Sequence, residues 1–197
     1  MLPDMLKIRT KEQLRQCLSI ELPFYECGYL QRFLHVSEKS ILRRHQILLR
    51  KTEYYSNSKN RLFALWYRFR LNKLQNRHSI HIPINCCEAG LHIMHLGPIL
   101  INSHAWIGSN CTMHINTAVV ANGISGDAPH LGNGIVLGIG AVIVGPVFLA
   151  DHVAVGANAL VNRSFEEENI AVAGVPAKRI SNNGSLEWNK KKDGESQ

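Results

Sequence analysis

Several short motifs common in enzymes are missing from this 197-residue sequence. It contains no Gly-x-x-x-x-Gly-Lys-Ser/Thr loop and no Gly-x-Ser-x-Gly turn, so it predicts neither a P-loop nucleotide site nor an α/β-hydrolase. Its five cysteines include no Cys-x-x-Cys pair, and their odd number does not suit a disulfide framework. We therefore expect reduced thiols, with Cys111 as a small core residue.

Long apolar runs are also missing. The first residues have no apolar region of the signal-peptide kind. Residues 134–150 carry no charge, but they are slightly short for a membrane span. That stretch also contains glycines and a proline at the spacing expected of turns between short strands. The sequence thus predicts a cytoplasmic protein without a transmembrane segment.

Acidic residues are scarce in the first part of the chain. Residues 1–80 have a net charge of +10, whereas residues 81–180 have a net charge of −3. Such a basic region can attract nucleic acid, anionic lipid or an anionic partner. Because aromatic residues make up only 7% of the chain and no nucleic-acid-binding motif is present, we expect a solvated helical face and no nucleic-acid partner.

The N-terminal region has helical patterning. The pattern predicts helices over residues 11–20, 24–36, 38–55 and 61–76. Ser37 is the expected N-cap of the third helix, with Ser40 as the alternative. Amphipathic spacing predicts these apolar faces: Ile41, Leu42, His45, Leu48, Leu49 and Thr52 in the third helix, and Leu62, Leu65, Trp66, Phe69 and Leu74 in the fourth. It places these cations on solvated faces: Arg43, Arg44, Arg50, Lys51, Arg61, Arg68, Arg70 and Lys73.

After Pro83, a branched aliphatic residue or Met recurs at every sixth position. The row comprises Ile101, Ile107, Met113, Val119, Leu131, Leu137, Ile143, Leu149, Val155 and Val161. A second row of generally smaller residues lies four positions later: Ala105, Cys111, Thr117, Ile135, Ala141, Val147, Val153 and Ala159. A period of six fits neither an α-helix nor a simple strand, and it is typical of a β-helix built from stacked short strands. The one gap, at Ser125, falls in a polar stretch that we interpret as a loop leaving the coil.

These patterns divide the chain into three parts. An α-helical region over residues 1–79 precedes a parallel β-helix over residues 80–180, and a polar tail over residues 181–197 is predicted to be disordered. The fold class is therefore mainly β. Because an open last coil would expose unpaired strand edges, the acidic stretch 166–168 and then residues 170–180 are the expected cap.

Histidine is the residue type with the clearest catalytic potential, because its pKa lies near neutrality. Six of the ten histidines lie between residues 81 and 130: His81, His92, His95, His104, His114 and His130. Taken one at a time, each fits a surface or corner position. A general base needs only one of them, correctly placed.

Three passages add a more specific signal. They are residues 90–101 (GLHIMHLGPILI), 107–114 (IGSNCTMH) and 173–178 (AGVPAK). Together they resemble the hexapeptide-repeat acyltransferases with a left-handed β-helix, and within them the serine acetyltransferase group with its capsule and exopolysaccharide O-acetyltransferase relatives. The resemblance implies a left-handed parallel β-helix that uses acetyl-CoA to acetylate a hydroxyl. It also implies a homotrimer, or a dimer of trimers, with active sites between neighbouring β-helices.

The resemblance further implies roles for individual residues. His95 matches the catalytic histidine that removes the proton from the acceptor hydroxyl, and His130 and His114 are further candidates for this site. Five small residues would let acetyl-CoA lie along the coils: Gly138, Gly140, Ala141, Gly156 and Ala157. Two cations, Lys178 and Arg179, follow them in the sequence. The two cations would meet the cofactor phosphates. No metal ligand is expected.

Two departures from the family's pattern bear on the acceptor. The serine acetyltransferases place an aspartate fifteen residues before the catalytic histidine, where this chain has Ile80. Ala128 stands where they have a second catalytic histidine, and His130 follows two residues later. Glu88, His92 or a backbone carbonyl are then candidates to orient His95. We take these departures to favour a sugar or polysaccharide-precursor hydroxyl over serine, with serine O-acetylation as the alternative.

Three other functions are alternatives to acetyl transfer. A zinc carbonic anhydrase of this fold needs two histidines five residues apart, and no pair here has that spacing. A non-catalytic trimeric scaffold would use the basic helices as its interaction surface. Transfer from an acidic acyl-carrier protein would also use that basic region, although the passages around His95 and Pro176 fit the acetyl-CoA group better.

Overall fold

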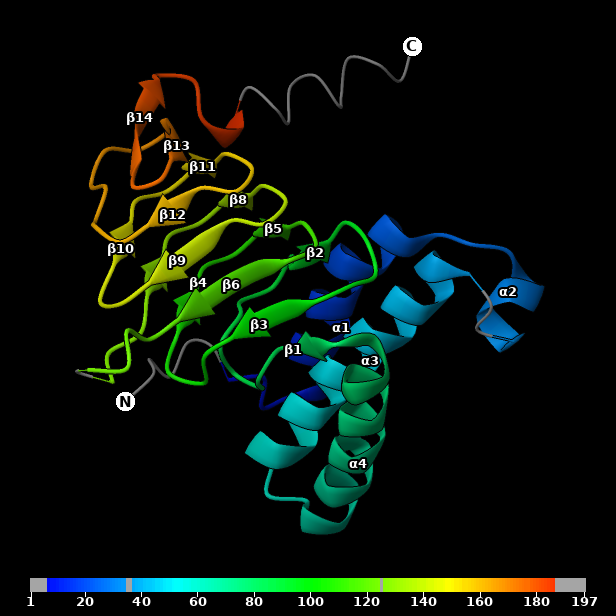
Figure 1. Cartoon of the computed structure of the whole chain (residues 1–197). Helices are drawn as coiled ribbons and strands as arrows, with labels where there is room; N and C mark the ends of the chain where they lie inside the picture. The colour runs from blue at the N-terminus through cyan, green and yellow to red at the C-terminus, as the bar shows by residue number, and fades with distance from the viewer. Residues whose placement is uncertain (1–6, 35–36, 125, 187–197) are drawn as a thin grey trace.

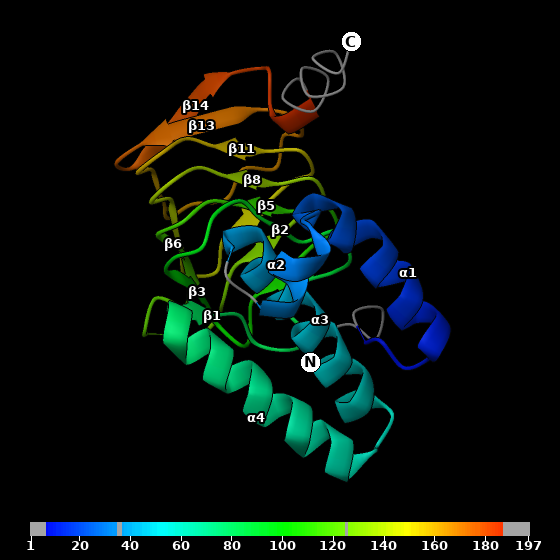
Figure 2. The ribbon, with the colours of Figure 1, turned by 90° about the vertical axis from the view of Figure 1, so that its right-hand side faces the viewer.

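The computed structural model, which describes residues 7–34, 37–124 and 126–186, places a layer of helices at one end of a stack of β-coils (Figure 1). The helical elements are α1 (Lys11–Glu21), the 3₁₀ helix η2 (Leu22–Tyr25), α2 (Tyr29–Leu34), α3 (Glu38–Asn57) and α4 (Arg61–His78). Helix α3 packs against both α1 and α4 (Figure 2). In both views α4 lies at the end of the molecule opposite the C-terminal hairpin. No helix in the described ranges has the length and apolar content needed to cross a bilayer.

The helix boundaries follow local sequence. Ser37 is the N-cap of α3, as predicted: its hydroxyl accepts a hydrogen bond from Ser40 N, and the Ser40 hydroxyl accepts one from Ser37 N. Thr10 and Gln13 form the same reciprocal cap on α1. Helix α4 ends where Ser79 adopts the left-handed conformation, at φ 57°.

The β-strands are short and pair in parallel from coil to coil, apart from a final antiparallel hairpin. One sheet has the order β1 (Ile80–His81), β3 (Ile99–Ile101), β6 (Thr117–Val120), β9 (Val142–Val144), β12 (Leu160–Val161). The second has β4 (Trp106–Ile107), β7 (His130–Leu131), β10 (Phe148–Leu149). The third has β2 (His92–Ile93), β5 (Thr112–Met113), β8 (Val136–Leu137), β11 (Ala154–Val155), β13 (Ala171–Gly174), β14 (Ala177–Ser181). The chain visits the three sheets in turn, which makes a β-helix. We call them sheets A, B and C.

The six-residue period is confirmed by burial. Every member of both predicted rows, from Ile101 to Val161 and from Ala105 to Ala159, is buried in the interior of the coils. The loop between β6 and β7 leaves the register intact, since Val119 pairs with Ile143 and Leu131 with Leu149. Ser125 itself lies outside the described residues.

The C-terminal end of the β-helix is covered. Strand β13 pairs with β11, and β14 folds back antiparallel on β13, so the predicted cap is present. Ser185 is fully buried, and its hydroxyl donates to Gly134 O. The prediction of a disordered tail from residue 181 is therefore wrong as far as residue 186, because this segment packs onto the coils. The rest of the predicted tail lies outside the described residues.

Arg50 joins the helices to the first coil. It was predicted on a solvated face, but it is fully buried, so that prediction is wrong. Its guanidinium donates to the carboxylates of Glu21 and Glu53 and to the carbonyls of Cys87 and Glu88. A buried charge requires such complete pairing. The pairing fixes α1 and α3 against the start of the β-helix.

The apolar face of α4 differs from the prediction. Leu74 is buried as expected, together with Leu71. The other four predicted core residues are exposed: Leu62 (82%), Leu65 (69%), Trp66 (49%) and Phe69 (66%). Helix α4 therefore has two apolar stripes, of which only one packs against the molecule.

Candidate active site

His95 lies on the corner that follows β2, where the chain passes from sheet C to sheet A. The corner is held because Ile93 is buried and because Met94 N donates to Met113 O in the next coil. The His95 side chain is 55% exposed. A ring in this position is accessible to a substrate and is anchored by a rigid coil.

Glu38 lies beside His95. The His95 Nδ1 atom is 3.5 Å from Glu38 Oε2, and Glu38 Oε1 accepts a hydrogen bond of 2.5 Å from Leu96 N. The carboxylate thus contacts both the ring and the backbone that follows it. With Nδ1 facing a carboxylate, Nε2 is the ring nitrogen left to act as a base. The predicted orienting candidates did not include Glu38.

The first turn of α3 carries Glu38, and two sets of contacts hold this helix in place. One is the buried Arg50 pairing described above. The other lies nearer the site, where Gln46 of α3 donates to Leu91 O. The helical region therefore completes the histidine site, because it supplies the acid and fixes the element that carries it.

Two of the other proposed orienting groups, His92 and Glu88, have different surroundings. The ring of His92 stacks on Phe24 with centroids 4.3 Å apart. Tyr25 OH accepts from Ile93 N at 2.7 Å and lies 3.2 Å from Ile93 O, so it fixes the open edge of β2. Burial raises the pKa of Glu88, and no contact joins Glu88 to His95 in the described part of the chain.

His114 is the second histidine of the site. It follows β5, one coil beyond His95, and the two ring centroids are 6.4 Å apart. The Thr117 hydroxyl donates to His114 O and stabilises the corner. The structure thus brings together two of the three predicted catalytic histidines.

The third, His130, lies elsewhere within the chain. It belongs to β7 in sheet B, where its ring packs 3.7 Å from the Trp106 ring and 5.7 Å from Phe148. Burial lowers its pKa. The prediction that His130 joins His95 is not met inside a single chain, because the two residues belong to different faces of the β-helix.

A strip of small residues continues from His114 along the coils. Successive backbone bonds run from His114 N to Leu137 O, from Gly138 N to Val155 O and from Gly156 N to Val172 O. Positions 114, 138 and 156 therefore stack, one per coil. Gly138 and Gly156 are half-buried, and the residues that follow them, Ile139 and Ala157, are exposed. The edge between His114 and the C-terminal hairpin therefore presents glycine backbone, bordered by the side chains of Ile139 and Ala157.

The packing of the coils also requires glycine at these positions. A Cβ at Gly138 would lie 2.8 Å from Ala157 N, and one at Gly156 would lie 2.8 Å from Ala173 Cβ. Gly140 has φ +72° at a turn, where a side chain would collide with Asn158. Ala141 is fully buried inside the coils, so the expectation that its side chain lines the cofactor site is wrong.

The two predicted phosphate-binding cations lie on β14. Lys178 is exposed. Arg179 donates to Glu167 at 2.5 Å and to Asn182. Arg179 is thus already paired within the cap, whereas Lys178 remains available to an anion.

Nothing in the described ranges assembles a metal site. No group of three or more His, Cys, Asp or Glu side chains there has the geometry to hold an ion. The five cysteines are free thiols, and burial raises the pKa of Cys111 to about 12. Cys111 is therefore a core residue, as predicted.

Comparison with known proteins identifies similar folds only. No family model matches the sequence, and no curated protein matches it. Serine acetyltransferase from Brucella abortus strain S19 is 16% identical with a TM-score of 0.65, over 89% of this chain and 72% of that chain. The Neisseria gonorrhoeae serine acetyltransferase is 22% identical with a TM-score of 0.66, over 90% and 69%. The Brucella enzyme in complex with coenzyme A gives 18% and 0.65, over 89% and 70%. The likeness confirms the predicted left-handed parallel β-helix with its preceding helices.

Proposed function

We propose that this chain is an acetyl-CoA-dependent O-acetyltransferase with His95 as its general base. The observation that carries the proposal is the pairing of an exposed, rigidly held histidine with Glu38, next to His114 and at the start of the small-residue strip. A histidine oriented by a carboxylate is a recurrent arrangement for moving a proton at neutral pH.

The proposed reaction is a direct transfer. The acceptor hydroxyl gives its proton to His95 Nε2 while its oxygen attacks the thioester carbonyl carbon of acetyl-CoA. The carbon–sulfur bond then breaks, and the thiolate of coenzyme A takes the proton back from His95. Glu38 holds the ring and stabilises its positive charge between these two steps.

Acetyl-CoA is proposed to bind along the strip from Gly138 to Gly156 and Ala157. A pantetheine chain needs a surface where it can approach the backbone, and the glycines of this edge present backbone, with the apolar side chains of Ile139 and Ala157 beside it. Lys178, at the far end of the strip, is the proposed contact for the cofactor phosphates. Coenzyme A is bound in the crystal structure of the Brucella enzyme, which has the same fold.

For the acceptor, a sugar or polysaccharide-precursor hydroxyl is preferred over serine. Position 80 is occupied by an aliphatic core residue, Ile80, and therefore supplies no carboxylate to His95. The acid comes instead from Glu38, in the helical region. This different source of the acid is the basis for preferring an acceptor other than serine. Serine O-acetylation is the alternative, since a Neisseria serine acetyltransferase of this fold has been crystallised with serine. The cytoplasm is the proposed location, which suits five free thiols.

The test is release of free coenzyme A from acetyl-CoA, with L-serine and with a panel of nucleotide sugars and oligosaccharides. His95→Ala should lower the rate with the true acceptor by about 10²–10⁴-fold, the usual contribution of a positioned base. His104→Ala is the matched control, because His104 is an exposed histidine on another corner of the coils.

Release only with a saccharide would support the preferred acceptor, and release with serine would establish the alternative. Full activity of His95→Ala would show that His95 is not the general base. Binding of acetyl-CoA without transfer to any acceptor would favour a scaffold.

A further inference from the structure

Helix α4 has an apolar surface that nothing in the described structure covers. Its residues are spaced i, i+3, i+4 and i+7, and we call them the α4 outer face: Leu62, Leu65, Trp66 and Phe69. All four side chains are at least 49% exposed. Large exposed apolar patches on soluble domains generally mark a binding surface.

Cations border the α4 outer face on both sides. On a helix of 3.6 residues per turn, Arg70 and Arg77 fall along one edge, and Arg61 and Arg68 fall along the other. Lys73 continues the face itself, one turn beyond Phe69. The sequence of α4 contains no aspartate or glutamate. In the described part of the chain, none of these five cations forms an ion pair with a carboxylate. The Arg70 guanidinium lies 4.5 Å from the centroid of the Trp66 ring, over its face.

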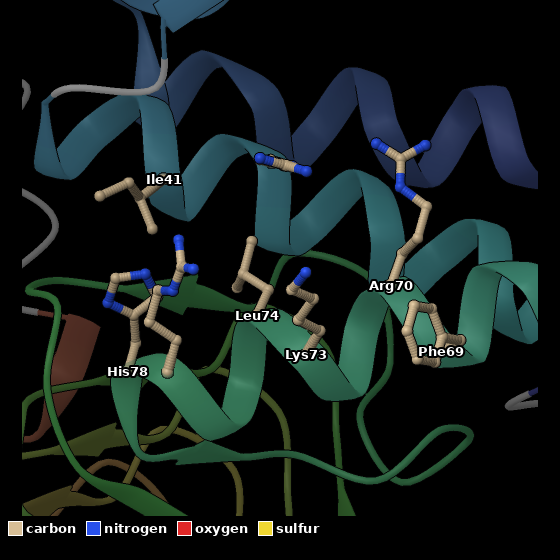
Figure 3. A pocket seen from close by; sticks show the side chains of 8 residues that line it. Ile41, Phe69, Arg70, Lys73, Leu74 and His78 are labelled. Atoms are coloured by element: carbon tan, nitrogen blue, oxygen red, sulfur yellow. The ribbon is translucent and has the colours of Figure 1, made fainter.

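A basic pocket continues this surface onto α3. Its volume is about 400 Å³, and Figure 3 shows Arg70, Lys73 and His78 rising from α4 along it, with Ile41 on the opposite helix. Arg44 and Arg77 also line it. Burial, and then repulsion from Arg70 and Arg77, lowers the pKa of Arg44. A cluster of cations with this repulsion is stabilised by an anion.

We propose that the α4 outer face and its cationic borders dock this protein on a membrane surface that contains anionic phospholipid. Helices that lie in a bilayer interface have Trp, Phe and Leu on one face and Lys or Arg beside it, as α4 does. Cations that lie next to such a surface are attracted by its anionic headgroups. The position of α4 at one end of the molecule leaves this face free to meet a flat surface (Figures 1 and 2).

Two other occupants fit less well. A second copy of the chain packed face to face would bring five cations against five, with no carboxylate on either helix to offset the repulsion. A nucleic acid would satisfy the cations but would leave the apolar centre of the face against phosphates. Of these three occupants, the anionic bilayer surface is the one that matches both parts.

The experiment is flotation of the full chain with vesicles of phosphatidylglycerol and phosphatidylcholine, compared with phosphatidylcholine alone. We expect binding to the anionic vesicles and little to the neutral ones. Lys73→Glu/Arg77→Glu should lower the partition coefficient by about tenfold or more. Leu62→Ser/Phe69→Ser should lower it as well, because the apolar side chains insert below the headgroups. The control is Lys11→Glu/Arg15→Glu on α1, which reverses two equally exposed cations elsewhere.

A second readout follows Trp66. With Trp106 and Trp188 replaced by Phe, the Trp66 emission should shift to shorter wavelength when anionic vesicles are added. Equal binding to both vesicle types would overturn the proposal, and so would a serine pair that floats like the original chain. A molecular mass that falls in the serine variant, without vesicle binding, would identify a second copy as the occupant instead.

Discussion

Glu38 is the residue that most changes the interpretation of the histidine site. It contacts the His95 ring and, from a position 58 residues earlier in the chain, Leu96 N. Nothing in the sequence around Glu38 predicts this, because an acidic residue in the first turn of a helix is already explained by the helix dipole. Only the packing of α3 against the first coil brings the two together.

We predict that Glu38→Gln lowers kcat by up to about a hundredfold while the KM for acetyl-CoA changes little. The amide retains an acceptor for Leu96 N, but it loses the negative charge beside the imidazolium that forms during transfer. Coenzyme A release at saturating and at limiting acetyl-CoA separates the two constants. Glu12→Gln on α1 is the control. An unchanged kcat, or a change confined to KM, would mean that Glu38 does not position His95.

His45 predicts an acid-sensitive step in stability. It is fully buried, with Nδ1 3.2 Å from Gln46 Oε1 and Nε2 3.1 Å from Gln75 Nε2. Because Gln75 also donates to Ile82 O, its nitrogen is oriented as the donor toward His45 Nε2. A proton on Nε2 would then face another donor. Burial lowers the pKa of His45 to about 4.

Between about pH 6.5 and about pH 4 the unfolded chain binds a proton at this position and the folded chain does not. The free energy of unfolding should therefore decrease on acidification through this window, by as much as about 3 kcal/mol from His45. Urea unfolding at about pH 7 and about pH 5 measures it. His45→Gln should flatten the dependence, and His104→Gln should not. If the free energy of unfolding of His45→Gln depends on pH as strongly as that of the original chain, the effect comes from other groups.

At the scale of elements, the coils were predictable, and so was the apolar face of α3, where Leu42, His45, Leu48, Leu49 and Thr52 are buried. The buried side of α4 and the burial of Arg50 were not. The six-residue period maps directly onto interior positions, so one sequence pattern gives every buried residue of both rows. Helix α4 has two apolar stripes, and spacing alone does not say which one is buried. Arg50 lies on the cationic side of the α3 helical wheel, so spacing alone predicts that it is exposed. It is buried because it pairs with Glu21, which is 29 residues away in the chain. The positions missed are those decided by contacts between elements.

The strip along the β-helix gives a prediction for the coils as a unit. Ala157→Trp should fill the edge beyond Gly138 and Gly156 and raise the KM for acetyl-CoA by at least about tenfold, a loss of ~1.4 kcal/mol in binding. Because Ala157 is exposed, stability should change little. Ser103→Trp, at an exposed position on a different corner, is the control. An unchanged KM would place the cofactor on another face.

At the scale of the whole molecule, one chain leaves its site open. The His95 ring is 55% exposed, and the strip beside it lies at the surface of a single β-helix. Attack of the acceptor oxygen on the thioester carbonyl is favoured where water is excluded, because hydrolysis is prevented and charges are not screened. A second wall is needed, and a neighbouring copy is the proposed source.

We therefore predict a homotrimer, with a mass in solution three times the 22.1 kDa of the chain, or six times for a dimer of trimers. Light scattering after size exclusion measures the mass, and dilution below the dissociation constant of the oligomer should lower activity per chain together with it. Leu62→Ser/Phe69→Ser should keep the trimer, because the α4 outer face is assigned to a membrane and not to a second copy. A fully active monomer would show that one chain excludes water unaided, and it would leave the helical region, with Glu38, as the only wall that the β-helix requires.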